Sequence, residues 1–99
     1  MVSIQDICNA IKGRNVVRFY YDGHERIVEP HLVGEKTSGS IALSAWQVGG
    51  YSESNSYPLW RNYILNEITN FSHTGATFSG SRPGYNPNDK TMSRIICRI

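Results

Sequence analysis

Two arginines on predicted strands are the residues of this sequence best placed to do chemistry. Arg26 alternates with Val28 along one strand, and Arg61 alternates with Tyr63 along another. Because a guanidinium group cannot be buried without a partner, we expect both side chains at the rim of the hydrophobic core. Two guanidinium groups at one rim can hold a phosphate group, since each donates parallel hydrogen bonds to it.

A second interpretation of these arginines needs no ligand. Glu25, Glu29 and Glu67 lie near them in the sequence, and each carboxylate can pair with a guanidinium group. Arg26 and Arg61 would then serve the fold instead of a ligand. The sequence leaves both interpretations open.

Aromatic side chains are candidates for stacking on a base. Tyr20 is one, and Trp46 and Trp60 lie on the faces opposite to the predicted core rows, where we expect them to be exposed. Stacking contributes roughly 1–3 kcal/mol per base in proteins that bind single strands, but the same side chains also build subunit interfaces. His31 is either a further ligand contact or a residue whose polar atoms are satisfied within the fold.

A polar loop late in the chain is another candidate site. Arg82, Tyr85, Asn86 and Lys90 combine positive charge, an aromatic ring and an amide group, which suits recognition of a base and its phosphate. The segment is also rich in Asn, Gly and Pro, which are turn formers. A plain structured turn is therefore the alternative interpretation.

Motifs of catalysis and metal binding are not found in this sequence. It has no nucleophile elbow and no phosphate loop. His24, His31 and His73 do not have metal-ligand spacing with each other or with the cysteines. We therefore expect a protein that is not an enzyme, with no metal and no cofactor. A small hydrolase whose site assembles only in space is the remaining alternative.

The residues before 13 predict one short helix, over about 3–12. Ser3 suits the N-cap position, Asp6 lies in the first turn and Gly13 suits the end. Apolar side chains recur with helical spacing on one face, at Ile4, Ile7, Cys8 and Ile11.

The rest of the chain, about 15–99, predicts a mainly β fold. Strand patterns occupy 15–21, 25–33, 40–48, 60–65 and 92–99, with a helical turn at 66–71 and extended chain around 77–78. Asp22-Gly23 predicts a hairpin turn, and Pro30 predicts an edge, a bulge or a bend. Five short strands after one helix favour a small SH3-like or Sm-like barrel, because closure protects the edges of so small a sheet.

Length, charge and cysteine content narrow the class of protein. The chain has 99 residues, which predicts one domain over 1–99. Its formal charge of +2 permits a phosphate-bearing partner without requiring one. We expect Cys8 and Cys97 to be buried free thiols, since a disulfide framework in a short secreted chain needs more cysteines, and a bridge between them is the alternative. No signal-peptide pattern and no run of roughly 18 apolar residues is found, so we expect a cytoplasmic protein without membrane attachment.

The order of these patterns resembles the WYL domain family. The match extends over about residues 4–78 and is strongest between 17 and 30. At the position of the Trp-Tyr-Leu triplet that names the family stands Ile41-Ala42-Leu43, which keeps only the leucine. The residues that carry the resemblance are Ala10-Ile11, Val17, Phe19, Tyr21, Arg26, Val28, Glu29, Pro30, the middle strand 40–46, Arg61, Tyr63, Leu65 and Ile68.

The resemblance implies an Sm-like barrel that binds a nucleotide-like molecule or a short single-stranded nucleic acid in a basic and aromatic groove. It also implies a regulatory role. Relatives usually carry a helix-turn-helix domain, for which this sequence has no room, so we expect a sensor or sequestering protein of the phage-encoded or accessory kind. We expect it to act as a homo-oligomer or through a separate partner. The alternative is a protein-interaction module that uses Trp46, Trp60 and the loop 49–58.

Overall fold

The computed structural model of the chain describes residues 2–51 and 59–99. Most of the loop 49–58, offered above as a protein contact, lies outside these residues. The described part contains a helix, a 3-10 turn and six strands. In chain order they are α1 (Ile4–Lys12), β1 (Asn15–Tyr21), β2 (His24–Lys36), β3 (Ile41–Gly50), β4 (Leu59–Ile64), η1 (Leu65–Glu67), β5 (Thr69–Thr77) and β6 (Met92–Arg98).

Helix α1 confirms the predicted helix and its caps. The Ser3 hydroxyl accepts a hydrogen bond from the Asp6 backbone N–H at 3.0 Å, and the Asp6 carboxylate accepts one from the Ser3 N–H at 3.3 Å. This reciprocal pair satisfies N–H groups that a helix start leaves without partners. The buried face is narrower than predicted, because Ile4 is exposed and Cys8 is half-buried. It consists of Ile7, Ala10 and Ile11.

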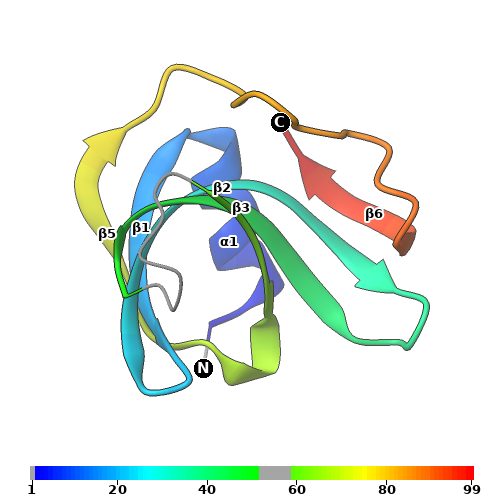
Figure 1. The fold of residues 1–99 in the computed structure, drawn as a ribbon, viewed down its shortest axis with the longest axis horizontal. Helices are drawn as coiled ribbons and strands as arrows, with labels where there is room; N and C mark the ends of the chain where they lie inside the picture. Colours follow the sequence, from blue (N-terminus) through cyan, green and yellow to red (C-terminus); the bar gives the residue numbers. More distant parts are fainter. Residues whose placement is uncertain (1, 52–58) are drawn as a thin grey trace.

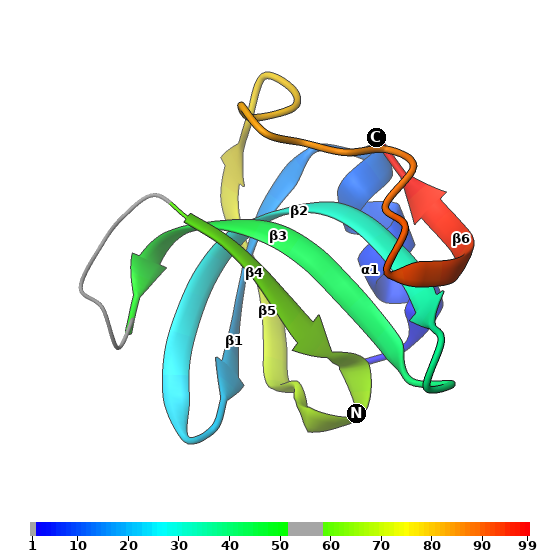
Figure 2. The ribbon, with the colours of Figure 1, turned by 45° about the vertical axis from the view of Figure 1, so that its right-hand side comes forward.

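The strands form one antiparallel sheet that curves around α1 (Figures 1 and 2). Five of them follow the order β4-β3-β2-β1-β5, and β6 is added to β2. β2 is long enough to pair with β1 through its first half and with β6 through its second half, while β3 runs along its other side. The mainly β fold is confirmed. The sheet has six strands in the described residues instead of five, and it is not closed, since β4 and β5 do not pair.

Local turn chemistry fixes the shape of β2 at both predicted points. The hairpin between β1 and β2 turns at Asp22 and Gly23, which have φ of 53° and 75°. Two successive residues with positive φ match the twist of a two-residue hairpin. Farther along β2, the register to β3 shifts between Pro30 and Leu32. This confirms the predicted irregularity at Pro30, which has no N–H to donate to the ladder.

The segment after β4 differs from the prediction. The helical turn expected at 66–71 is shorter, and it is the 3-10 turn η1, Leu65–Glu67. β5 then begins at Thr69, well before the extended chain expected around 77–78. Pairing with β1 explains the difference, because a ladder to a neighbouring strand overrides weak local preference.

The core lies between α1 and the concave face of the sheet. A second, smaller cluster of Leu32, Ala42 and Met92 lies on the opposite face of the sheet. It is buried because residues 78–91, which we call the C-terminal loop, run from β5 to β6 over this face (Figure 2). The main core contains Ile7, Phe19, Val28, Leu43, Tyr63 and Ile68 among others.

The expectation of two free thiols is wrong. Cys8 of α1 and Cys97 of β6 form a disulfide, with their Cα atoms 5.9 Å apart. The reason lies in the sheet: β6 pairs with the far half of β2 and so reaches α1, although the two cysteines are 89 residues apart in sequence. The disulfide therefore fastens the last strand to the first helix.

Candidate functional site

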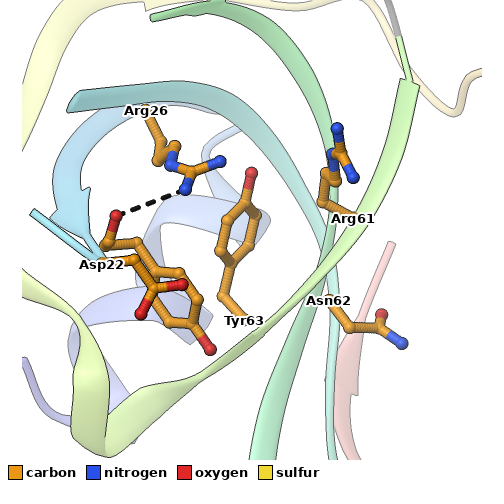
Figure 3. Close-up of a pocket in the computed structure, with 6 residues that line it drawn as sticks. Asp22, Arg26, Arg61, Asn62 and Tyr63 are labelled. Atoms are coloured by element: carbon orange, nitrogen blue, oxygen red, sulfur yellow. Dashed lines mark hydrogen bonds between the residues drawn. The ribbon is translucent and has the colours of Figure 1, made fainter. Parts of the chain in front are cut away.

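The two candidate arginines line one hollow of about 200 Å³ (Figure 3). Arg26 comes from the start of β2, and Arg61 and Tyr63 alternate on β4, so that all three point to the concave side. We call this space the arginine hollow. Its lining residues are Tyr21, Asp22, Arg26, Arg61, Asn62 and Tyr63.

Arg26 is the most unusual residue of the arginine hollow. It is only 8% exposed, so its guanidinium group is buried and not open to solvent. Its hydrogen bonds go to two backbone carbonyl groups, of Tyr51 at 3.2 Å and Tyr21 at 3.3 Å. Both acceptors are neutral, and among the described residues Arg26 forms no ion pair. Its guanidinium carbon also lies 5.5 Å from the ring centre of Tyr51 and 5.9 Å from that of Tyr21.

The carboxylates nearest to Arg26 in the sequence are engaged elsewhere. Glu25 pairs with Arg18 at 3.7 Å, and Glu29 pairs with Arg82 at 2.8 Å. The structural interpretation of Arg26 as the partner of Glu25 or Glu29 is therefore not seen. The positive charge of Arg26 faces the arginine hollow without a carboxylate partner among the described residues.

The aromatic walls of the arginine hollow are held in place from behind. Tyr63 meets Tyr21 edge to face, with ring centres 5.0 Å apart, and is itself buried. The Tyr21 hydroxyl accepts a hydrogen bond from the Ile64 N–H at 3.0 Å, and burial raises the pKa of this phenol. The sequence analysis named Tyr63 as a neighbour of Arg61 and as part of the family resemblance but not as a site residue, and the alternation along β4 was the signal that could have included it.

A second aromatic pair lies beside Arg26. Tyr51 is 40% exposed, and its ring stacks on His24 with centres 3.8 Å apart. The Tyr51 carbonyl also accepts a hydrogen bond from the buried Gln47 side chain at 2.6 Å. A ring that is exposed but fixed at its backbone can stack on a planar ligand at low entropic cost. The sequence analysis did not single out this pair.

A separate cluster is built around Arg82 on the other face of the sheet. Arg82 donates two hydrogen bonds of 2.8 Å to the buried carboxylate of Glu29. The backbone N–H of Arg82 donates to His31 Nε2 at 3.2 Å. Nδ1 of His31 therefore carries the proton and donates to the Glu29 backbone carbonyl at 2.8 Å. The indole N–H of Trp60 donates to the Pro83 carbonyl at 2.8 Å. We call these contacts the loop clamp, because they fasten the C-terminal loop to β2 and β4.

Several predicted site residues are buried or half-buried by the loop clamp. His31 is fully buried, and its ring packs on Trp60 and stacks on Phe78. Trp46 and Trp60 meet edge to face at 5.4 Å, and Arg82 lies 5.6 Å from the Trp46 ring centre. Both tryptophans are half-buried, so the expectation that they are exposed is wrong. The C-terminal loop covers their faces, which the alternation of the strands alone could not show.

A second hollow, of about 280 Å³, lies between β4 and the C-terminal loop. We call it the loop hollow. Asn62 lines both the loop hollow and the arginine hollow. The residues around the loop hollow are Ser44, Trp60, Asn62, Gly84, Tyr85, Asn86 and Asp89.

The remaining predicted site residues lie apart from the arginine hollow. Tyr20 is exposed on β1, and Lys90 is exposed in the C-terminal loop. Tyr85 is half-buried and its hydroxyl donates to the Ile99 carbonyl at 3.2 Å. The structure thus brings Arg26 and Arg61 together, and it gathers His31, Trp46, Trp60, Arg82, Tyr85 and Asn86 around the C-terminal loop.

No family model, curated protein or solved structure matches this chain. Within residues 2–51 and 59–99, no group of three His, Cys, Asp or Glu side chains is arranged to hold a metal ion. No helix in that part of the chain has the length and apolar character needed to cross a bilayer.

Proposed function

We propose that this chain is a WYL-like binding module, without catalytic activity, for a phosphate-bearing nucleotide or a short single-stranded nucleic acid. The observation that carries the proposal is Arg26, a buried cation that faces the arginine hollow without a carboxylate partner among the described residues. A sensor or a sequestering protein needs only such a site.

The charge of Arg26 is the first step of the argument. Burying a cation is unfavourable unless an opposite charge compensates it. The carbonyl groups of Tyr21 and Tyr51 satisfy hydrogen bonds but carry no net charge. A phosphate group in the arginine hollow would supply the missing negative charge, and a guanidinium group matches its oxygen geometry.

The second step concerns the rest of the ligand. The exposed ring of Tyr51 lies next to Arg26 and stacks on His24. Arg61 lines the same hollow, on the far side of Tyr63 in Figure 3. A cation pair beside an exposed ring suits a nucleotide better than inorganic phosphate, because the base can stack while the phosphate is bound.

The order of the elements supports the proposed family resemblance. An N-terminal helix precedes five strands of order β4-β3-β2-β1-β5, with η1 between β4 and β5, and the sheet curves around its core. These features support a fold of the Sm-like or SH3-like kind. We also propose a homo-oligomer, since β5 pairs only with β1 in the described residues, and an unpaired strand edge invites pairing between copies.

The structure weakens the alternative of a protein-interaction module, because part of the surface that it requires is covered. Trp46 and Trp60, which it needs exposed, are packed under the C-terminal loop. We therefore keep ligand binding as the proposal.

Mass spectrometry of the gently purified protein tests the proposal first. The native mass gives the oligomeric state, and denaturation releases any bound nucleotide for identification. Calorimetric titration then compares the wild type with Arg26→Gln and Arg61→Gln. We expect each substitution to weaken nucleotide binding about tenfold or more, since a hydrogen bond to a charged group contributes roughly 1.5–3 kcal/mol.

Arg94→Gln is the matched control, because Arg94 pairs with Glu35 on an exposed surface. It should bind like the wild type. An empty protein, with no affinity for a nucleotide panel, would overturn the proposal.

A cytoplasmic location remains part of the proposal, and Cys8–Cys97 provides its test. Disulfides are rare in reducing compartments and persist in oxidising ones. Alkylation in rapidly quenched cells, followed by mass spectrometry, measures the thiol state directly. Two alkylated cysteines support the cytoplasm, whereas an intact bond in every molecule points to an oxidising compartment.

A further inference from the structure

We propose that the loop hollow is a second subsite that binds the neighbouring base of the same ligand, and that Asp89 selects a base with an exocyclic amino group. This inference rests on the proposed function and names its substrate class more closely. The ligand would then be at least a dinucleotide. Cytosine, adenine and guanine would be favoured over thymine and uracil at this subsite.

The position of β4 connects the two subsites. Arg61 points to the arginine hollow, and its neighbour Trp60 points to the loop hollow, because successive side chains of a strand point to opposite faces. Asn62 lines both hollows. In the described residues β4 pairs with β3, and the Ile64 N–H donates to the Tyr21 hydroxyl. A single ligand that passes Asn62 reaches both hollows.

The two hollows differ in charge, which gives the ligand its direction. Among the described residues, the lining of the arginine hollow includes the guanidinium groups of Arg26 and Arg61 and the carboxylate of Asp22, and Arg26 forms no ion pair. The loop hollow contains the carboxylate of Asp89 and no basic residue in its lining. A phosphate group is therefore attracted to the arginine hollow and repelled from the loop hollow. The loop hollow suits an uncharged group that donates hydrogen bonds.

Asp89 and Asn86 present an acceptor and a donor to this space. Asp89 Oδ1 accepts two hydrogen bonds from Thr91, from its N–H at 2.9 Å and its hydroxyl at 2.7 Å. Asn86 Oδ1 accepts one from the Asn88 N–H at 3.0 Å. These internal bonds hold both side chains by one oxygen. The second oxygen of Asp89 and the amide N–H groups of Asn86 are left for the ligand.

The chemistry of base edges explains the expected choice. Cytosine and adenine place an amino group beside a ring nitrogen that accepts, and guanine also carries an amino group. Each edge offers Asp89 a donor that projects from the ring. Thymine and uracil have one ring N–H between two carbonyl oxygens, and these oxygens repel a carboxylate. The pair of Asp89 and Asn86 therefore discriminates against them.

The rings of the loop hollow supply flat apolar surface and nothing else. The ring centres of Trp60 and Tyr85 lie 6.1 Å apart, with 22° between the ring planes. The indole N–H of Trp60 and the hydroxyl of Tyr85 already donate to carbonyl groups of the chain. Gly84 has φ of 86°, and a Cβ atom there would lie 3.1 Å from Trp60 Nε1. Gly84 thus lets the loop approach the indole closely. The subsite is formed before any ligand enters, which reduces the entropy lost on binding.

Calorimetric titration with three probes tests this inference. The probes are deoxycytidine monophosphate and the 5′-phosphorylated dinucleotides of deoxycytidine and thymidine. For the wild type we expect the deoxycytidine dinucleotide to bind about tenfold more tightly than the other two probes. Asp89→Asn should reduce this preference to less than about twofold and leave the monophosphate affinity unchanged. Arg26→Gln should weaken all three probes.

The control for the loop itself is Thr91→Val. It removes the hydroxyl that donates to Asp89 Oδ1 but keeps the carboxylate, so the preference should persist. Equal binding of both dinucleotides by the wild type, or an unchanged preference in Asp89→Asn, would overturn the second subsite while Arg26→Gln still weakened binding. If the wild type bound none of the three probes, the proposed function itself would fail.

Discussion

Arg26 belongs to strand β2, and Arg82 binds to Glu29 of the same strand, but the two arginines differ in how their charge is compensated. Arg82 is 42% exposed at its side chain, yet it has a bidentate carboxylate partner in Glu29. Arg26 is almost fully buried, and among the described residues its hydrogen bonds go to neutral carbonyl groups. A paired charge holds two parts of the chain together. A buried charge without an opposite partner is stabilised best when a ligand brings the missing charge.

The same contrast extends to the surroundings of each arginine. The loop clamp joins residues far apart in the sequence, since Glu29 and Arg82 are 53 positions apart. The arginine hollow is lined by residues of the β1–β2 hairpin and of β4. We therefore expect substitutions in the loop clamp to change stability and substitutions in the arginine hollow to change binding.

Removal of the disulfide is the largest expected perturbation of stability. Replacing Cys8 and Cys97 with serine should lower the free energy of unfolding by about 4 kcal/mol, because the bond closes a loop of nearly the whole chain. Urea denaturation of the oxidised wild type and the variant measures the loss. The affinity of the nucleotide probes for the arginine hollow should change by less than about twofold, since neither cysteine lines this hollow. A parallel loss of binding would show that the two regions are not independent.

Arg82→Ala should produce the next largest loss of stability. It leaves the carboxylate of Glu29, only 6% exposed, without its partner. Loss of one partner of a buried pair costs about 3–5 kcal/mol, and the partial exposure of Arg82 reduces our expectation to about 2 kcal/mol. Thermal and urea unfolding check this value.

The exposed pair of Arg94 and Glu35 provides the control for Arg82→Ala. Arg94→Ala should lower stability by less than about 0.5 kcal/mol. Similar losses in the two variants would mean that the Glu29 contact is not a structural clamp.

Acid should weaken the loop clamp through His31. Burial lowers the pKa of His31, although Glu29 opposes part of the shift. The unfolded chain takes up this proton near pH 6.5, while the folded chain takes it up only at lower pH. The free energy of unfolding should therefore fall as pH drops below about 6.5, by at most about 1.4 kcal/mol per pH unit.

Unfolding in urea at several pH values between 7.5 and 5.5 measures this dependence. His31→Gln should flatten the curve, whereas His73→Asn, at an exposed position of β5, should leave it unchanged. Parallel curves for the wild type and His31→Gln would assign the dependence to other groups.

The sequence predicted the features that depend on neighbours along the chain. The Ser3–Asp6 cap, the Asp22-Gly23 turn and the irregularity at Pro30 all follow from local chemistry. The alternation on two strands also placed Arg26 and Arg61 on the inner face, and this brought them to one hollow.

The features that the sequence did not predict depend on distant contacts. Cys8 and Cys97 are joined only because β6 pairs with the far half of β2. Trp46 and Trp60 were expected to be exposed because the period of a strand shows which face a side chain takes, but not what covers that face. The engagement of Glu29 by Arg82, which leaves Arg26 without this partner, is also a contact of this kind.

Arg26→Met is the sharpest test of the comparison, and its expected effect on stability is the smallest. If Arg26 serves a ligand, its buried charge contributes little to the empty protein, and an apolar side chain of similar length should be neutral or stabilising by up to about 1 kcal/mol. The same substitution should abolish binding of the phosphate probes. Unfolding in urea without ligand, paired with calorimetric titration, gives both values for one variant. A loss of stability as large as that of Arg82→Ala would instead place Arg26 with Arg82, as a residue that holds the fold together through the carbonyl groups of Tyr21 and Tyr51.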